Sequence, residues 1–138
     1  MKHRILVDTN ITLDYALNRP GFFEHAAKIF QAVEEKRLTG CVSSSAMTDI
    51  YYIVESSKDS DFAWETMEYL YRTAKILPVV RKTVRAALDS GMKDFEDAVQ
   101  AAAAKDAGID IAVTRDKMGF SNSGLQVYSP EEFSEELK

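Results

Sequence analysis

Short apolar runs alternate with longer amphipathic stretches along the whole chain, and this alternation constrains the fold more than any other feature. Strands are expected at residues 4–8, 40–44, 76–80, 109–114 and 125–129. Stretches with helical spacing of apolar residues separate them, at residues 22–38, 45–57, 60–75, 83–91, 93–108 and 129–138. The pattern predicts an α/β fold, a three-layer α/β/α sandwich with a mainly parallel central sheet of about five strands.

Length and composition narrow the class of protein. The chain has 138 residues, which suits a single domain over residues 1–138, and 46% of them are hydrophobic, enough for a core without disulfides. The single cysteine and the lack of a long apolar run predict a cytoplasmic protein without a membrane partner. A net charge of −5 argues against a general nucleic-acid coat protein, which is usually basic, but is compatible with a nuclease built on carboxylates.

Acidic residues recur where the strands of the predicted sheet end. They are Asp8 after the first strand, Asp49 in the helix after the second, Asp94, Glu96 and Asp97 at the start of the alanine-rich helix, and Asp116 after the fourth strand. In open α/β sheets, ligands bind outside the carboxyl ends of the strands. We therefore expect these carboxylates to meet at one edge of the sheet.

Each acid also has a structural interpretation. Asp8 and Asp116 suit turns, while Asp94 and Asp97 have the spacing of a helix-capping pair, with Glu96 as a surface residue between them. Asp49 is harder to explain in this way because it lies at the edge of the apolar face of its helix. A carboxylate buried there without a partner is costly, so it requires a cation or a hydrogen-bond donor.

Carboxylates gathered in one cleft repel each other and raise one another's pKa values, and a divalent metal ion relieves that repulsion. A site rich in oxygen ligands suits Mg²⁺ or Mn²⁺. Zinc is not expected, because the only histidines are His3 and His25, far apart in the sequence. A metal held by carboxylates can activate water and stabilise the charge that develops on a phosphodiester.

Three stretches together resemble the PIN domain, the fold of many metal-dependent ribonucleases. They are ILVDTN at residues 5–10, SSSAMTDIYYIV at 43–54 and DFEDAVQAAAAKDAGIDIAVTRDKMGF at 94–120. The resemblance covers roughly residues 4–130. Within the family, the chain resembles bacterial VapC-type toxins and their stand-alone relatives. It implies an endoribonuclease that hydrolyses RNA with Mg²⁺ or Mn²⁺, the toxin of a toxin–antitoxin pair with an antitoxin as partner, and a homodimer.

By the same resemblance, Asp8, Asp97 and Asp116 are metal ligands and catalytic acids. Asp49 takes the place of a further acid, where the family more often has Glu, and its side chain is one methylene shorter. The resemblance also assigns supporting roles to Asn10 and Thr114, which orient the ligands. Asp94 adjoins the metal shell or only caps its helix.

Basic residues near these acids are candidates to hold RNA phosphates. Arg115 and Lys117 bracket Asp116, and Arg81 and Arg85 follow the third strand. For each of them, a solvated surface charge is the alternative interpretation.

Two other interpretations compete with a nuclease. An aspartyl phosphotransferase of the haloacid-dehalogenase or receiver type requires a second Asp two residues after Asp8, or a differently placed acceptor, and Asn10 occupies the former position. A catalytically silent PIN module that acts through protein–protein contacts is the other alternative. Stabilisation of the protein by Mn²⁺ distinguishes an intact metal site from a silent module.

Overall fold

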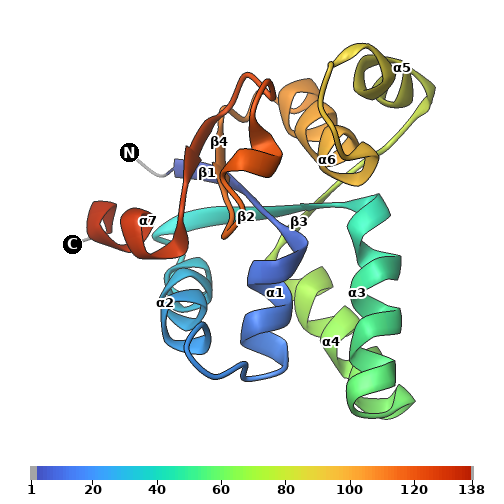
Figure 1. The fold of residues 1–138 in the computed structure, drawn as a ribbon. Coiled ribbons are helices and arrows are strands. Elements are labelled where there is room, and N and C mark those ends of the chain that lie inside the picture. Colours follow the sequence, from blue (N-terminus) through green and yellow to red (C-terminus); the bar gives the residue numbers. More distant parts are fainter. Residues whose placement is uncertain (1–2, 138) are drawn as a thin grey trace.

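A computed structural model describes residues 3–137 and contains one five-stranded sheet (Figure 1). The strands are β1 (His3–Val7), β2 (Leu38–Ser43), β3 (Lys75–Leu77), β4 (Ile111–Val113) and β5 (Gln126–Tyr128). Their order is β3-β2-β1-β4-β5, and every neighbouring pair is parallel. The predicted α/β architecture is confirmed, and all five strands deliver their carboxyl ends to the same edge.

Helices cover both faces of the sheet (Figure 1). They are α1 (Thr9–Ala16), α2 (Phe23–Glu34), α3 (Ser44–Ser57), α4 (Ser60–Thr73), α5 (Arg81–Asp89), α6 (Phe95–Asp106) and α7 (Pro130–Glu136), with a 3₁₀ turn η1 (Met118–Phe120). Alternate residues of β1 point to opposite faces, as strand geometry requires. Ile5 and Val7 join the core formed with α1 to α4, while Leu6 packs with alanines of α6.

Helix α6 is built for close contact with the sheet. Four consecutive alanines at residues 101–104 are buried, and small side chains let the helix approach β1 and β2. Asp94 caps its start by accepting a hydrogen bond of 2.9 Å from the backbone N–H of Asp97. The fully buried Gln100 is the one polar side chain among the buried residues of this helix that the structure describes.

Helix α1 was not expected from the sequence. Its residues include Thr9, Asn10, Ile11 and Thr12, types with low helix propensity, so local pattern did not signal it. Burial of Ile11 and Leu13 in the core stabilises the helix instead. Its position brings Asn10 into a helical turn rather than the loop that the sequence suggested.

The model also bears on the predicted absence of a membrane partner. Within residues 3–137, no helix is long and apolar enough to cross a lipid bilayer.

Candidate metal centre

Asp8 is the centre of the candidate site. It follows β1, caps α1 and is only 5% exposed. Its Oδ1 accepts hydrogen bonds from the Thr9 backbone N–H at 2.8 Å and from the Gln100 amide at 3.3 Å. Its Oδ2 accepts one from the Thr114 hydroxyl at 2.7 Å. The hydrogen-bond donors to this one carboxylate therefore come from α1, α6 and the residue after β4.

The partners of Asp8 are all neutral donors. Within residues 3–137, no Lys or Arg makes an ion pair or hydrogen bond with it. Burial raises the pKa of Asp8, the three hydrogen bonds partly offset that rise, and the charge of Asp116 adds to it. A buried carboxylate that no protein cation neutralises favours an external cation.

Asp97 and Asp116 face each other across Gly119. A Cβ atom at position 119 would lie 2.6 Å from Asp116 Oδ2 and 2.9 Å from Asp97 Oδ2, so only glycine fits between them. Asp116 is held in place by the Gly119 N–H, which donates to its Oδ1 at 3.0 Å, and by its own N–H, which donates to Thr114 at 3.0 Å. Burial, followed by the charges of Asp8, Asp94 and Asp116, raises the pKa of Asp97 to about 7.

A second pair of acids lies at the other end of the site. Asp49 is half-buried on α3, Glu96 lies in the first turn of α6, and both line the same hollow. Glu96 Oε1 also accepts from the Thr9 hydroxyl at 3.3 Å and from the Gln100 amide at 3.4 Å. Partial burial and the neighbouring Asp49 raise the pKa of Glu96 to about 7.

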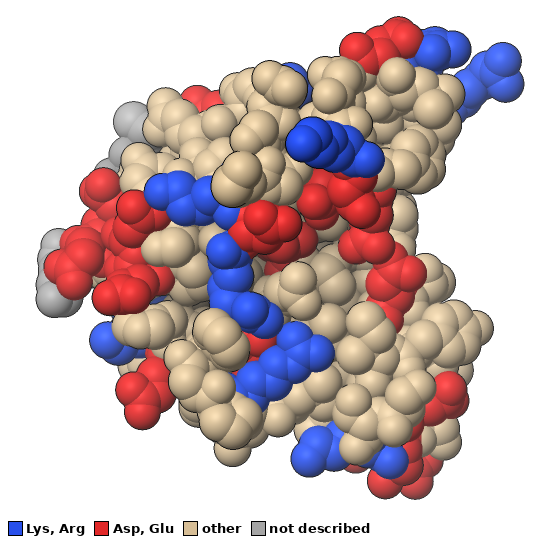
Figure 2. Space-filling view, in the orientation of Figure 1, with Lys and Arg blue, Asp and Glu red and all other residues tan. Residues whose placement is uncertain are grey.

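Two adjoining hollows contain these acids. One, of about 450 Å³, is lined by Asp8, Asp49 and Glu96, and the other, of about 410 Å³, by Asp116 and Gly119. Asp94 and Asp97 line both. Figure 2 shows the acidic side chains gathered on this face with Lys and Arg on either side of them. The sequence-predicted acids Asp8, Asp49, Asp97 and Asp116 thus line two hollows that share Asp94 and Asp97.

The donor set was tested against the divalent ion that the resemblance implies. Within residues 3–137, no three acidic, His or Cys side chains stand close enough to form a ready-made coordination group. Oxygen donors nevertheless line both hollows, and the space above Gly119 between two carboxylates is one that a single Cβ would fill. This chemistry fits a hard ion such as Mg²⁺ or Mn²⁺, which takes carboxylates and retains waters.

The predicted supporting residues lie beside the acids in three different ways. Thr114 is fully buried and donates to Asp8. Asn10 is exposed in the first turn of α1 and lines the larger hollow, and its side chain makes no hydrogen bond to a carboxylate of residues 3–137. Asp94 caps α6, as its structural interpretation required, and also lines both hollows.

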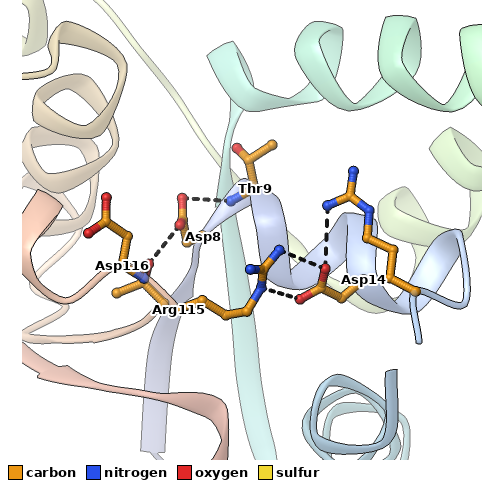
Figure 3. A network of polar contacts seen from close by, with 7 residues as sticks. Asp8, Thr9, Asp14, Arg115 and Asp116 are labelled. Atoms are coloured by element: carbon orange, nitrogen blue, oxygen red, sulfur yellow. Dashed lines mark hydrogen bonds and ion pairs between the residues drawn. The ribbon is translucent and has the colours of Figure 1, made fainter. Parts of the chain in front are cut away.

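Among the predicted RNA-binding residues, Arg115 has a second task. Its Nε lies 2.7 Å from Oδ2 of Asp14, and its Nη2 lies 3.1 Å from Oδ1 (Figure 3). Its guanidinium lies over the Phe22 ring, 3.9 Å from the ring centroid. Arg19 NH1 contacts Asp14 from the other side at 3.4 Å. Asp14 is 1% exposed, so the two arginines neutralise a buried charge.

The other predicted RNA-binding residues do not line the acidic hollows. Lys117 is exposed and pairs with Glu132 at 2.9 Å. Arg81 and Arg85 are exposed on α5, and neither lines the acidic hollows. Lys93, which the sequence analysis did not nominate, lines the smaller hollow.

Sequence reasoning left four contributors unassigned: Glu96 as a partner of Asp49, Gln100, Gly119 and Asp14. Gln100 carried a usable signal. It is the single amide in a run of alanines and valine, one helical turn after Glu96, and a polar residue on a buried helix face requires a partner. Gly119 and Asp14 had no comparable signal, since their roles depend on contacts distant in sequence.

Comparisons with known proteins identify a matching family and solved structures of similar fold. A family model described as PIN domain matches residues 4–118. The fold is similar to that of Rickettsia felis VapBC2 bound to a promoter DNA fragment, with a TM-score of 0.72 and 15% identity over 91% of this chain and 98% of that one. DNA-bound VapBC from Salmonella typhimurium gives a TM-score of 0.70 and 18% identity over 93% and 98% of the two chains.

A third similar structure is Mycobacterium tuberculosis VapC20, a toxin that cleaves the sarcin-ricin loop. Its TM-score is 0.62, with 16% identity over 78% of this chain and 86% of that one. No curated protein matches the chain in sequence. At these identities the structural matches establish the fold, and the PIN-domain model establishes the family.

Proposed function

Because the chain belongs to the PIN-domain family, we propose that it is a metal-dependent endoribonuclease that hydrolyses phosphodiester bonds in RNA. One observation carries the proposal. The buried carboxylate of Asp8, held only by neutral donors, lies among acids from three other segments of the chain. If the charge of Asp8 served to stabilise the fold, we would expect a Lys or Arg beside it, as Arg115 and Arg19 lie beside Asp14.

In this proposal, Asp8, Asp97 and Asp116 would hold Mg²⁺ or Mn²⁺, and Asp49 on α3 would add a further carboxylate. A divalent ion supplies Lewis acidity, which stabilises the charge that develops on a phosphodiester during hydrolysis. Thr114 orients Asp8 through its hydroxyl and fixes the backbone of Asp116 at the same time. Gly119 leaves the opening between Asp97 and Asp116 clear.

RNA phosphates require positive charge beside this acidic centre. We assign that role first to Lys93, which lines the smaller hollow, and to Lys117 and Arg115 beside Asp116. Arg115 retains donors that do not face Asp14, and its side chain is 30% exposed. Arg81 and Arg85 on α5 would contact RNA only beyond the immediate site.

The biological setting is part of the same proposal. The Rickettsia and Salmonella proteins of similar fold are VapBC assemblies, and VapC20 is an RNA-cleaving toxin. We propose by analogy that this chain is a single-domain cytoplasmic toxin that forms a homodimer and is held by an antitoxin. Light scattering of the purified protein, alone and co-expressed with the product of an adjacent gene, tests both associations.

The proposed activity is tested with fluorescent single-stranded RNA and Mn²⁺ or Mg²⁺. The protein, its Asp8→Asn variant and a Glu65→Gln control are compared, each with and without EDTA. Glu65 is exposed on α4, outside both hollows, so its variant removes one negative charge without touching the site. Cleavage that requires metal and Asp8 but not Glu65 supports the proposal. Lack of cleavage together with lack of Mn²⁺ stabilisation points to a silent module.

A further inference from the structure

The acids of the site form two groups that Asp8 joins. Asp97 and Asp116 lie on either side of Gly119, and Asp49 and Glu96 line the larger hollow beside them. Asp49 stands where the PIN-domain resemblance leads us to expect a longer Glu side chain. Glu96 reaches toward the same hollow from α6, one residue before Asp97. A longer carboxylate side chain is therefore present, but on α6 instead of α3.

Gln100 independently links Glu96 to the centre of the site. It is fully buried, and its amide nitrogen donates both to Asp8 Oδ1 at 3.3 Å and to Glu96 Oε1 at 3.4 Å. Its carbonyl oxygen has no hydrogen-bond partner among residues 3–137. A buried amide with one unmet oxygen is costly, so its placement here requires a compensating role. Holding two carboxylates at a fixed separation is such a role.

Thr9 supports the same arrangement. Its backbone N–H donates to Asp8 and its hydroxyl to Glu96, so one residue positions both acids. Glu96 thus shares two positioning residues with Asp8, whereas a freely solvated surface glutamate would share none. Asp49 and Glu96 also line the same hollow, where a cation would neutralise both charges.

We propose that Glu96 is a metal ligand of this site and supplies, from α6, the reach that Asp49 lacks. Gln100 and Thr9 act as positioning residues that hold Glu96 toward Asp8. The inference rests on the proposed metal-dependent function and extends its ligand set. It assigns to α6 two adjacent metal-facing acids, Glu96 and Asp97, in place of one.

The test measures Mn²⁺ affinity of the full chain by isothermal titration calorimetry, without RNA. Glu96→Gln keeps the size and hydrogen-bonding capacity of the side chain but removes its charge. We expect its Mn²⁺ dissociation constant to rise by at least about tenfold, since loss of metal-site partners typically costs that much. The Glu65→Gln control removes the same charge from an exposed position and is expected to bind Mn²⁺ like the unmodified protein.

A double variant makes the test specific to reach. Asp49→Glu combined with Glu96→Gln restores a long carboxylate on α3, and we expect it to recover part of the lost Mn²⁺ affinity. Unchanged affinity in Glu96→Gln overturns the inference while the proposed nuclease function stands. Failure of the unmodified protein to bind Mn²⁺ overturns both, so the two results are distinguishable.

Discussion

Two aspartates of the same helix region, Asp8 and Asp14, are equally removed from water but are satisfied in opposite ways (Figure 3). Asp14 is contacted by the guanidinium groups of Arg115 and Arg19. Within residues 3–137, Asp8 accepts hydrogen bonds only from neutral donors, and the charge of Asp116 further raises its pKa. Similar burial therefore accompanies two different tasks.

The difference separates a structural acid from a functional one. The Asp14 pair ties α1 to the segment between β4 and η1, so it fixes the backbone that carries Asp116. In the proposed function, Asp8 instead contributes its charge to a site for an external ion. Burial alone does not distinguish the two roles. The hydrogen-bond or ion-pair partners of each carboxylate distinguish them.

The largest expected effect on stability follows from breaking the Asp14 pair. Asp14→Asn leaves two partly buried arginines without their counter-charge, and removal of one partner of a buried pair costs about 3 kcal/mol of unfolding free energy. Urea denaturation in EDTA measures this loss. A change smaller than about 1 kcal/mol would contradict the structural assignment of Asp14.

Gly119→Ala tests the spacing of the acids with a single methyl group. The added Cβ would overlap Asp116 Oδ2 and Asp97 Oδ2, so the carboxylates must move apart. We expect a weaker Mn²⁺ affinity and a stability loss of about 1 kcal/mol, as for mild overpacking. Glu65→Gln, an exposed change outside both hollows, serves as the control. Equal Mn²⁺ affinity in the two variants would show that this spacing does not matter.

The pH dependence of the metal-free protein reports on Asp97. Its pKa is raised from 3.8 to about 7, so its contribution to stability is fully present below about pH 4 and is lost as the pH rises toward 7. The melting temperature in EDTA should therefore fall across this window more steeply in the unmodified protein than in Asp97→Asn. Mn²⁺ should remove the difference in slope, because it neutralises the charged form. Parallel curves in EDTA would contradict the repulsion described here.

The smallest effect is expected at an exposed ion pair. Arg85 and Asp89 lie 2.7 Å apart one turn from each other on α5, and both side chains are 65% exposed. Because such pairs contribute about 0.5 kcal/mol or less, Arg85→Ala should leave the urea midpoint nearly unchanged. A loss as large as that of Asp14→Asn would remove the distinction between buried and exposed pairs in this protein.

The sequence predicted the layered architecture because each strand has its own apolar run and each long helix has its own periodicity. The parallel order and the shared edge followed from that alternation, and so did the expected meeting of Asp8, Asp49, Asp97 and Asp116. Helix α1 was missed because its stability comes from burial of Ile11 and Leu13 rather than from local propensity.

Parts of the site could not be predicted because they depend on contacts between distant segments. Arg115 looked like a free RNA-binding residue, and only the fold brings Asp14 to it, across 101 positions of sequence. Gln100 reaches Asp8 across 92 positions, so its polarity signalled a partner without identifying it. Roles set by tertiary pairing are therefore the ones that sequence pattern leaves open.

The central claim is that Asp8 holds its charge for an external cation and not for the stability of the fold. Comparing the unfolding free energies of the unmodified protein and Asp8→Asn by urea denaturation in EDTA tests it most directly. We predict that Asp8→Asn is at least as stable as the unmodified protein, because it removes a buried, repelled charge and retains a hydrogen-bond acceptor. A loss comparable to that of Asp14→Asn would contradict the claim and make Asp8 a structural residue.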